Sequence, residues 1–488
     1  MPAQVSSEAA QRAYLVGLDG VPWISRNVLA DGILRIHRAT SESGQLVVPW
    51  SVPGRGVLTL RTASLRETDQ PYLLPVELAR GTIGRLRDRI AEWQTTGWQP
   101  SAQVQARLRR ATQAFAKATT SQHIPAAATR AADAALAEAC DAVELAMSEG
   151  ALASIRQRQQ DPQRWNILLA ANLGTSSASE LPADFSETFN AAVIAFPWNE
   201  IEGHVGSDEY DKYSQQIAWC RAKGLRICGG PLINFHRHGL PDWLYLWEED
   251  YDSLLSYMNR YVETIVGQFL GKVNLWHCWA GLNCGVPMDV PEEFRLRVAV
   301  STVETLRRSD PTAPVIVTID QPWGQYQSRR EHDLTPMHYA DTLLRAGLGV
   351  SGIGLELNMG YWPHGTLARD LLEVSQLIDR WALFGVPLVI FLTLPSQSTR
   401  DPQAAFPDED VQGVFADQVD SSTQAISSQQ LIRVLLGKPS VQGIVWNQLH
   451  DAARHAFPHG GLFDSQGHRK PVFDALREIR LRDLDQRL

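Results

Sequence analysis

The stretches AAVIAFPW (191–198), PVIVTID (314–320) and VPLVIFLTL (386–394) are short, almost continuously apolar runs, and they decide the fold class. Amphipathic segments lie between such runs, for example DYDSLLSYMNRYVETIVGQFLG (250–271), and most of them end in a glycine. Glycine is a common helix stop. Continuously apolar strands that alternate with helices indicate a parallel sheet covered by helices.

The same alternation runs from about residue 165 to the end of the chain. The strand candidates are NILLAANLG (166–174), AAVIAFPW (191–198), LRICGGPLINF (225–235), KVNLWHCWAG (272–281), PVIVTID (314–320), SGIGLELN (351–358), VPLVIFLTL (386–394) and VQGIVWNQL (441–449). Eight such units predict an α/β fold of the (β/α)8 TIM barrel type. An open doubly wound sheet is the alternative, but it usually carries a glycine-rich phosphate turn, and neither GxGxxG nor GxxxxGK[ST] occurs.

The chain before the barrel has two regions of different pattern. Residues 1–75 contain short apolar or alternating runs such as QLVVPWSV (45–52), separated by Gly, Pro and Ser turns. They predict a β-rich N-terminal domain, either a small β-sandwich or a cap that packs on the barrel. Residues 76–160 have helical periodicity and predict a helical connector. The barrel is then expected over residues 161–488.

Composition limits the classes of partner. The 488 residues carry a formal net charge of -9, with no basic stripe, so nucleic acid is not an expected partner. The five cysteines form no CxxC pair, and no disulfide framework, structural zinc site or cofactor is predicted. The sequence shows no signal peptide and no apolar run long enough for a membrane span, so we expect a cytoplasmic protein. The oligomeric state stays open.

Several segments resemble, in chain order, motifs of glycoside hydrolase family 10, the endo-xylanase barrels. They include FNAAVIAFPWNEIE (189–202), AKGLRICGGPLINFHRHGLPDW (222–243), GKVNLWHCWAGLN (271–283), FGVPLVIFLTL (384–394) and GGLFDSQGHRKPVFDALREI (460–479). The resemblance spans about 165–482. It implies a barrel that acts on or binds carbohydrate.

The residues that the family uses for catalysis are replaced. The position of its acid/base glutamate falls on Gly281, and that of its nucleophile falls on Leu392, or on Phe391 or Thr393 after a shift by one residue. Neither Gly281 nor Leu392 can donate a proton or attack an anomeric carbon, and a shift to Phe391 or Thr393 does not restore a carboxyl group. Other family positions fall on Gly230, Ala280, Glu202, Glu356 and Asn358, whereas Asn199, Glu200, Trp243, Trp446 and Asp451 match. The resemblance therefore implies that xylanase activity is lost.

Three acids are candidates for a relocated catalytic pair: Glu356, Glu200 and Asp320. Each lies in or just after a predicted strand, and barrel active sites form at the carboxyl ends of strands. Glu356 interrupts an otherwise apolar strand and shares its side-chain parity with Asn358. The alternative for Glu356 is a structural acid bonded to a neighbouring strand. For Glu200 and Asp320 it is a surface or helix-capping role.

Aromatic residues near strand ends are candidates for sugar binding, because aromatic faces stack on sugar rings. The predicted substrate-binding residues are Trp276, Trp323, Trp362, Trp446, Asn199, Asn358 and Asp451. The alternative for any single tryptophan is packing within or around the barrel. His236, His238 and His277 have no metal-ligand spacing, and no metal is predicted.

The sequence favours a carbohydrate-active barrel that binds a poly- or oligosaccharide in a remodelled cleft. Two alternatives stay open: an active glycosidase that uses the relocated carboxylates, and a non-catalytic structural or interaction protein. An inward cluster of acids at the barrel mouth would favour catalysis. An aromatic cleft without an acid pair would favour binding, and a mouth closed by the N-terminal region would favour a scaffold.

Overall fold

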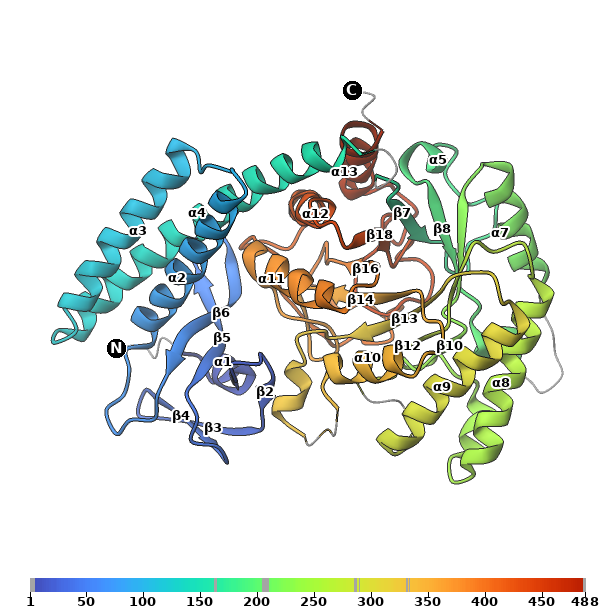
Figure 1. The fold of residues 1–488 in the computed structure, drawn as a ribbon, viewed down its shortest axis with the longest axis horizontal. Helices are drawn as coiled ribbons and strands as arrows, with labels where there is room; N and C mark the ends of the chain where they lie inside the picture. The colour runs from blue at the N-terminus through green and yellow to red at the C-terminus, as the bar shows by residue number, and fades with distance from the viewer. Residues whose placement is uncertain are drawn as a thin grey trace.

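The computed structural model describes residues 5–161, 165–203, 210–284, 288, 290–330, 332 and 334–485. Eight parallel strands close into a barrel in the order β11-β13-β14-β16-β18-β7-β8-β9 (Figure 1). They are β7 (Leu168–Asn172), β8 (Ala191–Ile194), β9 (Arg226–Gly229), β11 (Leu275–His277), β13 (Val315–Asp320), β14 (Gly352–Asn358), β16 (Leu388–Thr393) and β18 (Val441–Trp446). Because β9 pairs with both β8 and β11, the ring has no free edge. The predicted TIM barrel is confirmed, and the open sheet is excluded.

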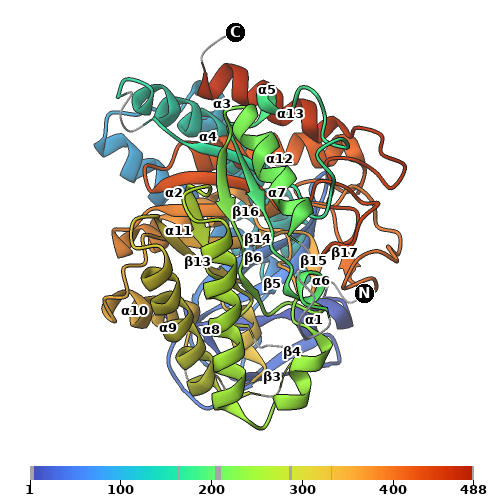
Figure 2. The ribbon, with the colours of Figure 1, turned by 90° about the vertical axis from the view of Figure 1, so that its right-hand side faces the viewer.

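Helices surround this ring. They are α5 (Phe185–Thr188), α6 (Trp198–Ile201), α7 (Asp211–Ala222), α8 (Tyr251–Gln268), α9 (Glu292–Ser309), α10 (Pro336–Arg345), α11 (Leu371–Trp381), α12 (Ser421–Leu436) and α13 (Pro471–Ile479). Figure 2 shows α8 and α9 side by side on the outer face. On α8, Leu254, Met258 and Val262 recur every four residues and are fully buried, as expected for a helix with one apolar face.

The loops contain short strands and short helical turns. Two pairs of very short strands extend the barrel: β10 (Ile233–Asn234) with β12 (Trp279–Ala280), and β15 (Tyr361–Trp362) with β17 (Asp410–Val411). The remaining turns are η1 (Asp242–Trp247), η2 (Gln325–Ser328), η3 (Ala382–Phe384) and the π-helical η4 (Arg480–Leu484).

The barrel interior changes from apolar to polar along its axis. Its apolar layer is a cluster made of Ala170, Ala191, Val193, Cys228, Ile316, Val389, Phe391 and Val445. Asn172, Thr393 and Asn447 lie two residues further along three of these strands, so their side chains also point into the barrel. These three side chains line a cavity at the carboxyl end. Parallel strands end at one rim, so the polar residues gather there.

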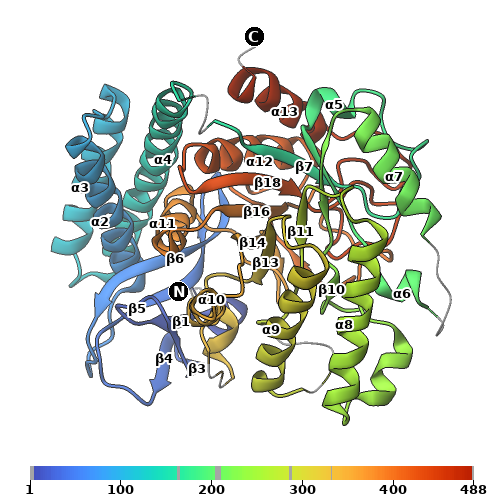
Figure 3. The same cartoon turned by 45° about the vertical axis from the view of Figure 1, so that its right-hand side comes forward.

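The N-terminal region contains a four-stranded sheet in the order β2-β1-β5-β6 and a separate hairpin, β3–β4. Its elements are α1 (Ser7–Arg12), β1 (Tyr14–Val16), β2 (Pro22–Trp23), β3 (Ser25–Ala30), β4 (Ile33–Arg38), β5 (Gly44–Val52) and β6 (Gly56–Leu65). The helices α2 (Leu74–Thr95), α3 (Ala102–Thr120) and α4 (Pro125–Arg158) follow. Figure 3 shows them to one side of the barrel, beyond α11.

Buried ion pairs join this region to the barrel. On α2, Arg85 contacts Asp370 at 2.9 Å and Glu373 at 3.0 Å, and Arg61 of β6 also pairs with Glu373. Both carboxylates lie at the start of α11. The arginines lower the pKa of Glu373 to about 2, against the opposing effect of burial. The N-terminal sheet is therefore held on the α11 side of the ring.

Candidate functional site

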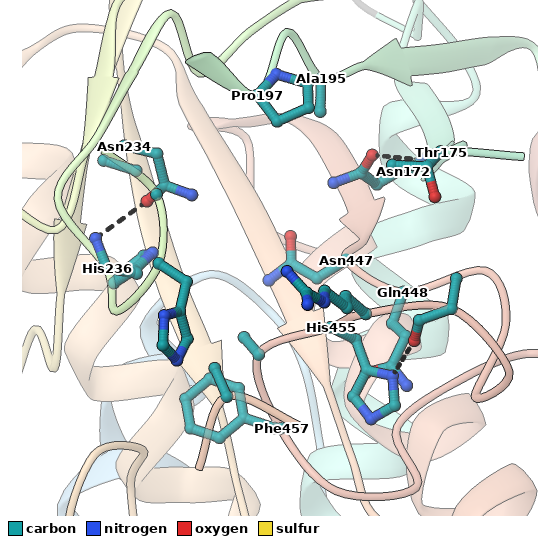
Figure 4. A pocket seen from close by; sticks show the side chains of 18 of the residues that line it. Asn172, Thr175, Ala195, Pro197, Asn234, His236, Asn447, Gln448, His455 and Phe457 are labelled. Carbon is teal, nitrogen blue, oxygen red and sulfur yellow. Dashed lines mark hydrogen bonds between the residues drawn. The ribbon is translucent and has the colours of Figure 1, made fainter. Parts of the chain in front are cut away.

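A cavity of about 690 Å³ opens at the carboxyl ends of the barrel strands. Its lining includes residues at the ends of β7, β8, β14, β16 and β18 and in the loops that follow. Figure 4 shows part of the lining, with Asn447 near the centre of the view. None of the described residues between 5 and 161 lines it. The described part of the N-terminal region therefore does not close the mouth.

Glu356 lies inside this cavity and is 7% exposed. One of its carboxylate oxygens accepts hydrogen bonds from Asn447 Nδ2 at 2.7 Å and Asn358 Nδ2 at 3.1 Å. Burial and the nearby charge of Asp320 raise the pKa of Glu356 to about 7, although His236 and the two amides oppose the rise. Glu356 can therefore donate or accept a proton near neutral pH.

Asp320 lies beside Glu356 and holds a histidine. The two acids are register partners on β13 and β14. Asp320 Oδ1 lies 2.7 Å from His236 Nε2, and Oδ2 accepts the Gly281 N–H at 2.9 Å. Burial disfavours the imidazolium of His236, but Asp320 and Glu356 outweigh burial and raise the pKa of His236 to about 9. At neutral pH the cavity therefore contains a cationic histidine.

Gly281 occupies the position at which the family resemblance places the acid/base glutamate. Its φ is 78°, in the region that favours glycine. A Cβ at this position would lie 2.9 Å from His236 Cδ2 and 3.1 Å from the His236 backbone nitrogen. The imidazole of His236 therefore fills the space into which a side chain at 281 would project.

The position of the family nucleophile has no carboxyl group either. Phe391 and Thr393 line the cavity, whereas Leu392 is fully buried in the core outside the barrel interior. Strand parity accounts for this, because neighbouring residues of β16 point to opposite faces. The end of β16 thus offers a hydroxyl group and an aromatic ring to the cavity.

His277 also lines the cavity but is buried and uncharged. Its Nε2 lies 2.9 Å from the Trp279 carbonyl oxygen and 3.1 Å from Thr318 Oγ1, while its Nδ1 has no partner among the described residues. Burial lowers the pKa of His277 to about 4. Donation from Nε2 to the carbonyl leaves Nδ1 as a hydrogen-bond acceptor.

Among the other predicted polar residues, Asn199, Glu200 and Asn358 line the cavity. Glu200 is exposed on α6, with Tyr213 Oη 3.4 Å from one carboxylate oxygen. Asp451 lies elsewhere, in a buried ion pair with Lys470, and also accepts hydrogen bonds from Gln448 and the Gly461 N–H. The structure thus brings Glu356, Asp320 and Asn358 together, places Asn199 and Glu200 on the same cavity, and gives Asp451 structural partners.

The four predicted tryptophans are not among the residues that line this cavity. Trp276 and Trp446 are fully buried, and their indole nitrogens donate to Asp310 Oδ2 at 3.1 Å and to the Gly460 carbonyl at 2.9 Å. Trp323 stacks against Arg369, with the guanidinium carbon 4.4 Å from the ring centroid. Arg12 and Arg329 lie over Trp362. These indoles make structural contacts in the protein.

Sequence reasoning missed most of the amides in the cavity. Seven amide side chains line it: Asn172, Asn199, Asn234, Asn358, Asn447, Gln403 and Gln448. Asn172 and Asn447 could have been predicted. Each lies at or just past the end of an apolar strand, at a position where the alternation of side chains points it into the barrel. Asn234 ends the two-residue strand β10, which is too short to show an alternating pattern, and Gln403 lies in a loop, where spacing carries no such information.

The part of the chain that the structure describes contains no cluster of three or more His, Cys, Asp or Glu side chains arranged to hold a metal ion. None of its helices is long and apolar enough to cross a membrane.

The closed ring and its cavity define the class of protein: a (β/α)8 barrel with a polar site at the carboxyl ends of its strands. No protein family model matches the chain. Similar solved structures include xylanase 10B from Thermotoga maritima, with 16% identity and a TM-score of 0.49 over 68% of this chain and 99% of that chain. Xylanase 10B from Thermotoga petrophila RKU-1, solved with xylobiose, has 16% identity and a TM-score of 0.47 over 66% and 95%.

Xylanase B from Clostridium stercorarium F9 is also similar, with 14% identity and a TM-score of 0.48 over 64% of this chain and 97% of that chain. These structures come from the family whose motifs the sequence resembles. At such identities the likeness is one of fold.

Proposed function

We propose that this protein binds an oligo- or polysaccharide in the cavity at the carboxyl end of its barrel. The observation that supports this proposal is that seven amide side chains line one cavity. An amide group has both donors and acceptors, and a sugar hydroxyl uses both. The volume of about 690 Å³ lies within the range of ligand pockets.

Several of these amides are oriented in advance. Asn172 Oδ1 accepts the Gly174 N–H at 2.9 Å, and Asn234 Oδ1 accepts the His236 N–H at 3.0 Å. Asn447 Nδ2 donates to Glu356. Asn172 Nδ2, Asn234 Nδ2 and Asn447 Oδ1 have no protein partner among the described residues, and all three side chains line the cavity (Figure 4). Fixing one end of an amide reduces the entropy lost when its other end binds a ligand.

Hydrolysis of a glycosidic bond is the second candidate function, and the contacts of Glu356 favour it. A buried carboxyl group with a raised pKa stands beside Asp320 and the imidazolium of His236. General acid–base catalysis requires groups that can donate and accept a proton within one site. No carboxylate occupies the inherited positions, so this chemistry would depend on Glu356 and Asp320.

A glycan screen by titration calorimetry, followed by a hydrolysis assay on every ligand found, tests both functions. We expect Asn447→Ala and Asn172→Ala to weaken binding at least about tenfold, since each removes a polar contact from a desolvated site. Gln442→Ala, at the amino end of β18, is the matched control and should not change affinity. Failure to bind any glycan would overturn the proposal. Binding without turnover would remove only the second function.

A further inference from the structure

One side of the cavity carries a group of cationic side chains. We call it the basic wall and define it as His236, Arg237 and Arg454, all of which line the cavity. His236 lies deepest, with its Nε2 on Asp320, and the two arginines are exposed at the rim. This grouping contrasts with the net charge of -9 of the whole chain.

Backbone contacts join three loops into this wall. Arg237, in the loop after β10, donates from Nη1 to the Ala405 carbonyl oxygen at 3.2 Å. The Ala405 N–H donates to the His455 carbonyl at 2.8 Å, and Arg454 directly precedes His455. In Figure 4, His236 lies at the left and Phe457 and His455 lie in the lower part of the view, with Ala195 and Pro197 at the top. Hydrogen bonds therefore link the loops that carry the basic wall.

Neither arginine is in an ion pair with a described carboxylate. Arg237 has the single hydrogen bond to Ala405, and Arg454 has no hydrogen bond or ion pair within the described residues. The acids that line the cavity are Glu200, Asp242 and Glu356. Glu200 and Asp242 are exposed, and Glu356 carries only part of a charge at neutral pH. The guanidinium groups of the wall are thus available to an anion.

We propose that the ligand is an acidic glycan, and that a uronic acid carboxylate of this ligand lies against the basic wall. This inference rests on the glycan binding proposed above and names the class of sugar. A guanidinium group presents paired N–H donors that match the two oxygens of a carboxylate. The imidazolium of His236 adds a charged donor deeper in the cavity, where the dielectric is lower. His236 already has Asp320 as its counter-charge, whereas a neutral sugar would leave the guanidinium groups of Arg237 and Arg454 without one.

The test compares acidic oligosaccharides with their methyl esters, which keep the sugar and the linkage and remove only the charge. The probes are oligogalacturonates, oligomannuronates and hyaluronan tetrasaccharide, each with its ester, measured by calorimetry on the full chain beside xylotetraose and cellotetraose. We expect an acid to bind at least about tenfold more tightly than its ester, and this preference to shrink as ionic strength rises.

Arg454→Gln is the decisive variant, because the exposed Arg454 side chain makes no hydrogen bond or ion pair with a described residue and its loss should not disturb the fold. It should weaken binding of the acid about tenfold and leave the ester unchanged. Arg35→Gln, on the distant β4, is the matched control. Equal affinity for acid and ester, or binding of neutral glycans alone, would overturn this inference while leaving glycan binding intact. Binding of no probe or screened glycan would overturn both.

Discussion

Asp320 and Glu356 face each other across the ladder between β13 and β14, as register partners on adjacent strands. Their carboxyl groups have different surroundings: Asp320 binds His236 and a backbone N–H, whereas Glu356 is held by two amides. Two acids at the same height in one barrel therefore have different hydrogen-bond partners. This difference is the source of the first two predictions.

Glu356→Gln should flatten the pH dependence of stability. The pKa of Glu356 is raised from its ordinary 4.5 to about 7 in the folded protein. The group therefore contributes stability that is fully present below pH 4.5 and is lost as pH rises through about 7. The loss is on the order of 3 kcal/mol at most. Urea unfolding from pH 4 to 8 measures it, and an unchanged profile in the variant would refute the assignment.

Asp320→Asn should lower the pKa of His236, because the carboxylate holds the imidazolium. The pKa of His236 is raised from 6.5 to about 9, so its contribution to stability is present below pH 6.5 and lost as pH rises through about 9. Histidine NMR titration measures the change directly. The exposed His468 serves as the internal control, since its signal should not respond to the substitution. A His236 titration unaffected by Asp320→Asn would contradict the geometry.

Gly281→Ala should destabilise the protein by about 1–3 kcal/mol, through backbone strain at positive φ and contact with His236. Gly271→Ala is the matched control, because Gly271 has a φ of 71° and no atom near its missing Cβ. This control measures the effect of backbone strain without the contact with a neighbouring side chain. Gly281→Ala should lose more stability than Gly271→Ala, and adding His236→Ala to Gly281→Ala should remove part of this difference. Equal effects at Gly281 and Gly271 would show that His236 does not crowd the site.

Lys470→Met should lower the free energy of unfolding by about 3–5 kcal/mol, because it leaves the carboxylate of Asp451 buried without its partner. Lys470 Nζ also donates to Ser396 Oγ at 2.8 Å and to the His459 carbonyl at 3.1 Å. Adding Asp451→Asn should recover part of the loss. Denaturant unfolding of the single and double variants measures this coupling. Additive effects would show that the pair does not interact.

The eight strands could be predicted from the sequence because a buried parallel strand is a short apolar run between helices. The inward direction of Glu356 was readable for the same reason, since it alternates with Leu355 and Leu357. The same rule places Trp276 opposite in parity to His277, and Trp446 opposite to Asn447. The outward direction of these two indoles was therefore also present in the sequence.

Other parts of the site could not be predicted. His236 and Asp320 are 84 residues apart, and their contact depends on the path of the loop after β10. The basic wall depends on three loops that meet through hydrogen bonds to backbone carbonyl groups, which no spacing of side chains encodes. Loop conformation has no periodic signal comparable to that of strands and helices.

The occupied space above Gly281 restricts the order in which a carboxylate can be introduced at this point of the cavity. A glutamate introduced there alone would need a left-handed backbone and would collide with an imidazole that Asp320 holds in place. His236 has to be exchanged for a smaller residue first, so the glutamate cannot be introduced in a single step and the substitution of His236 has to precede it.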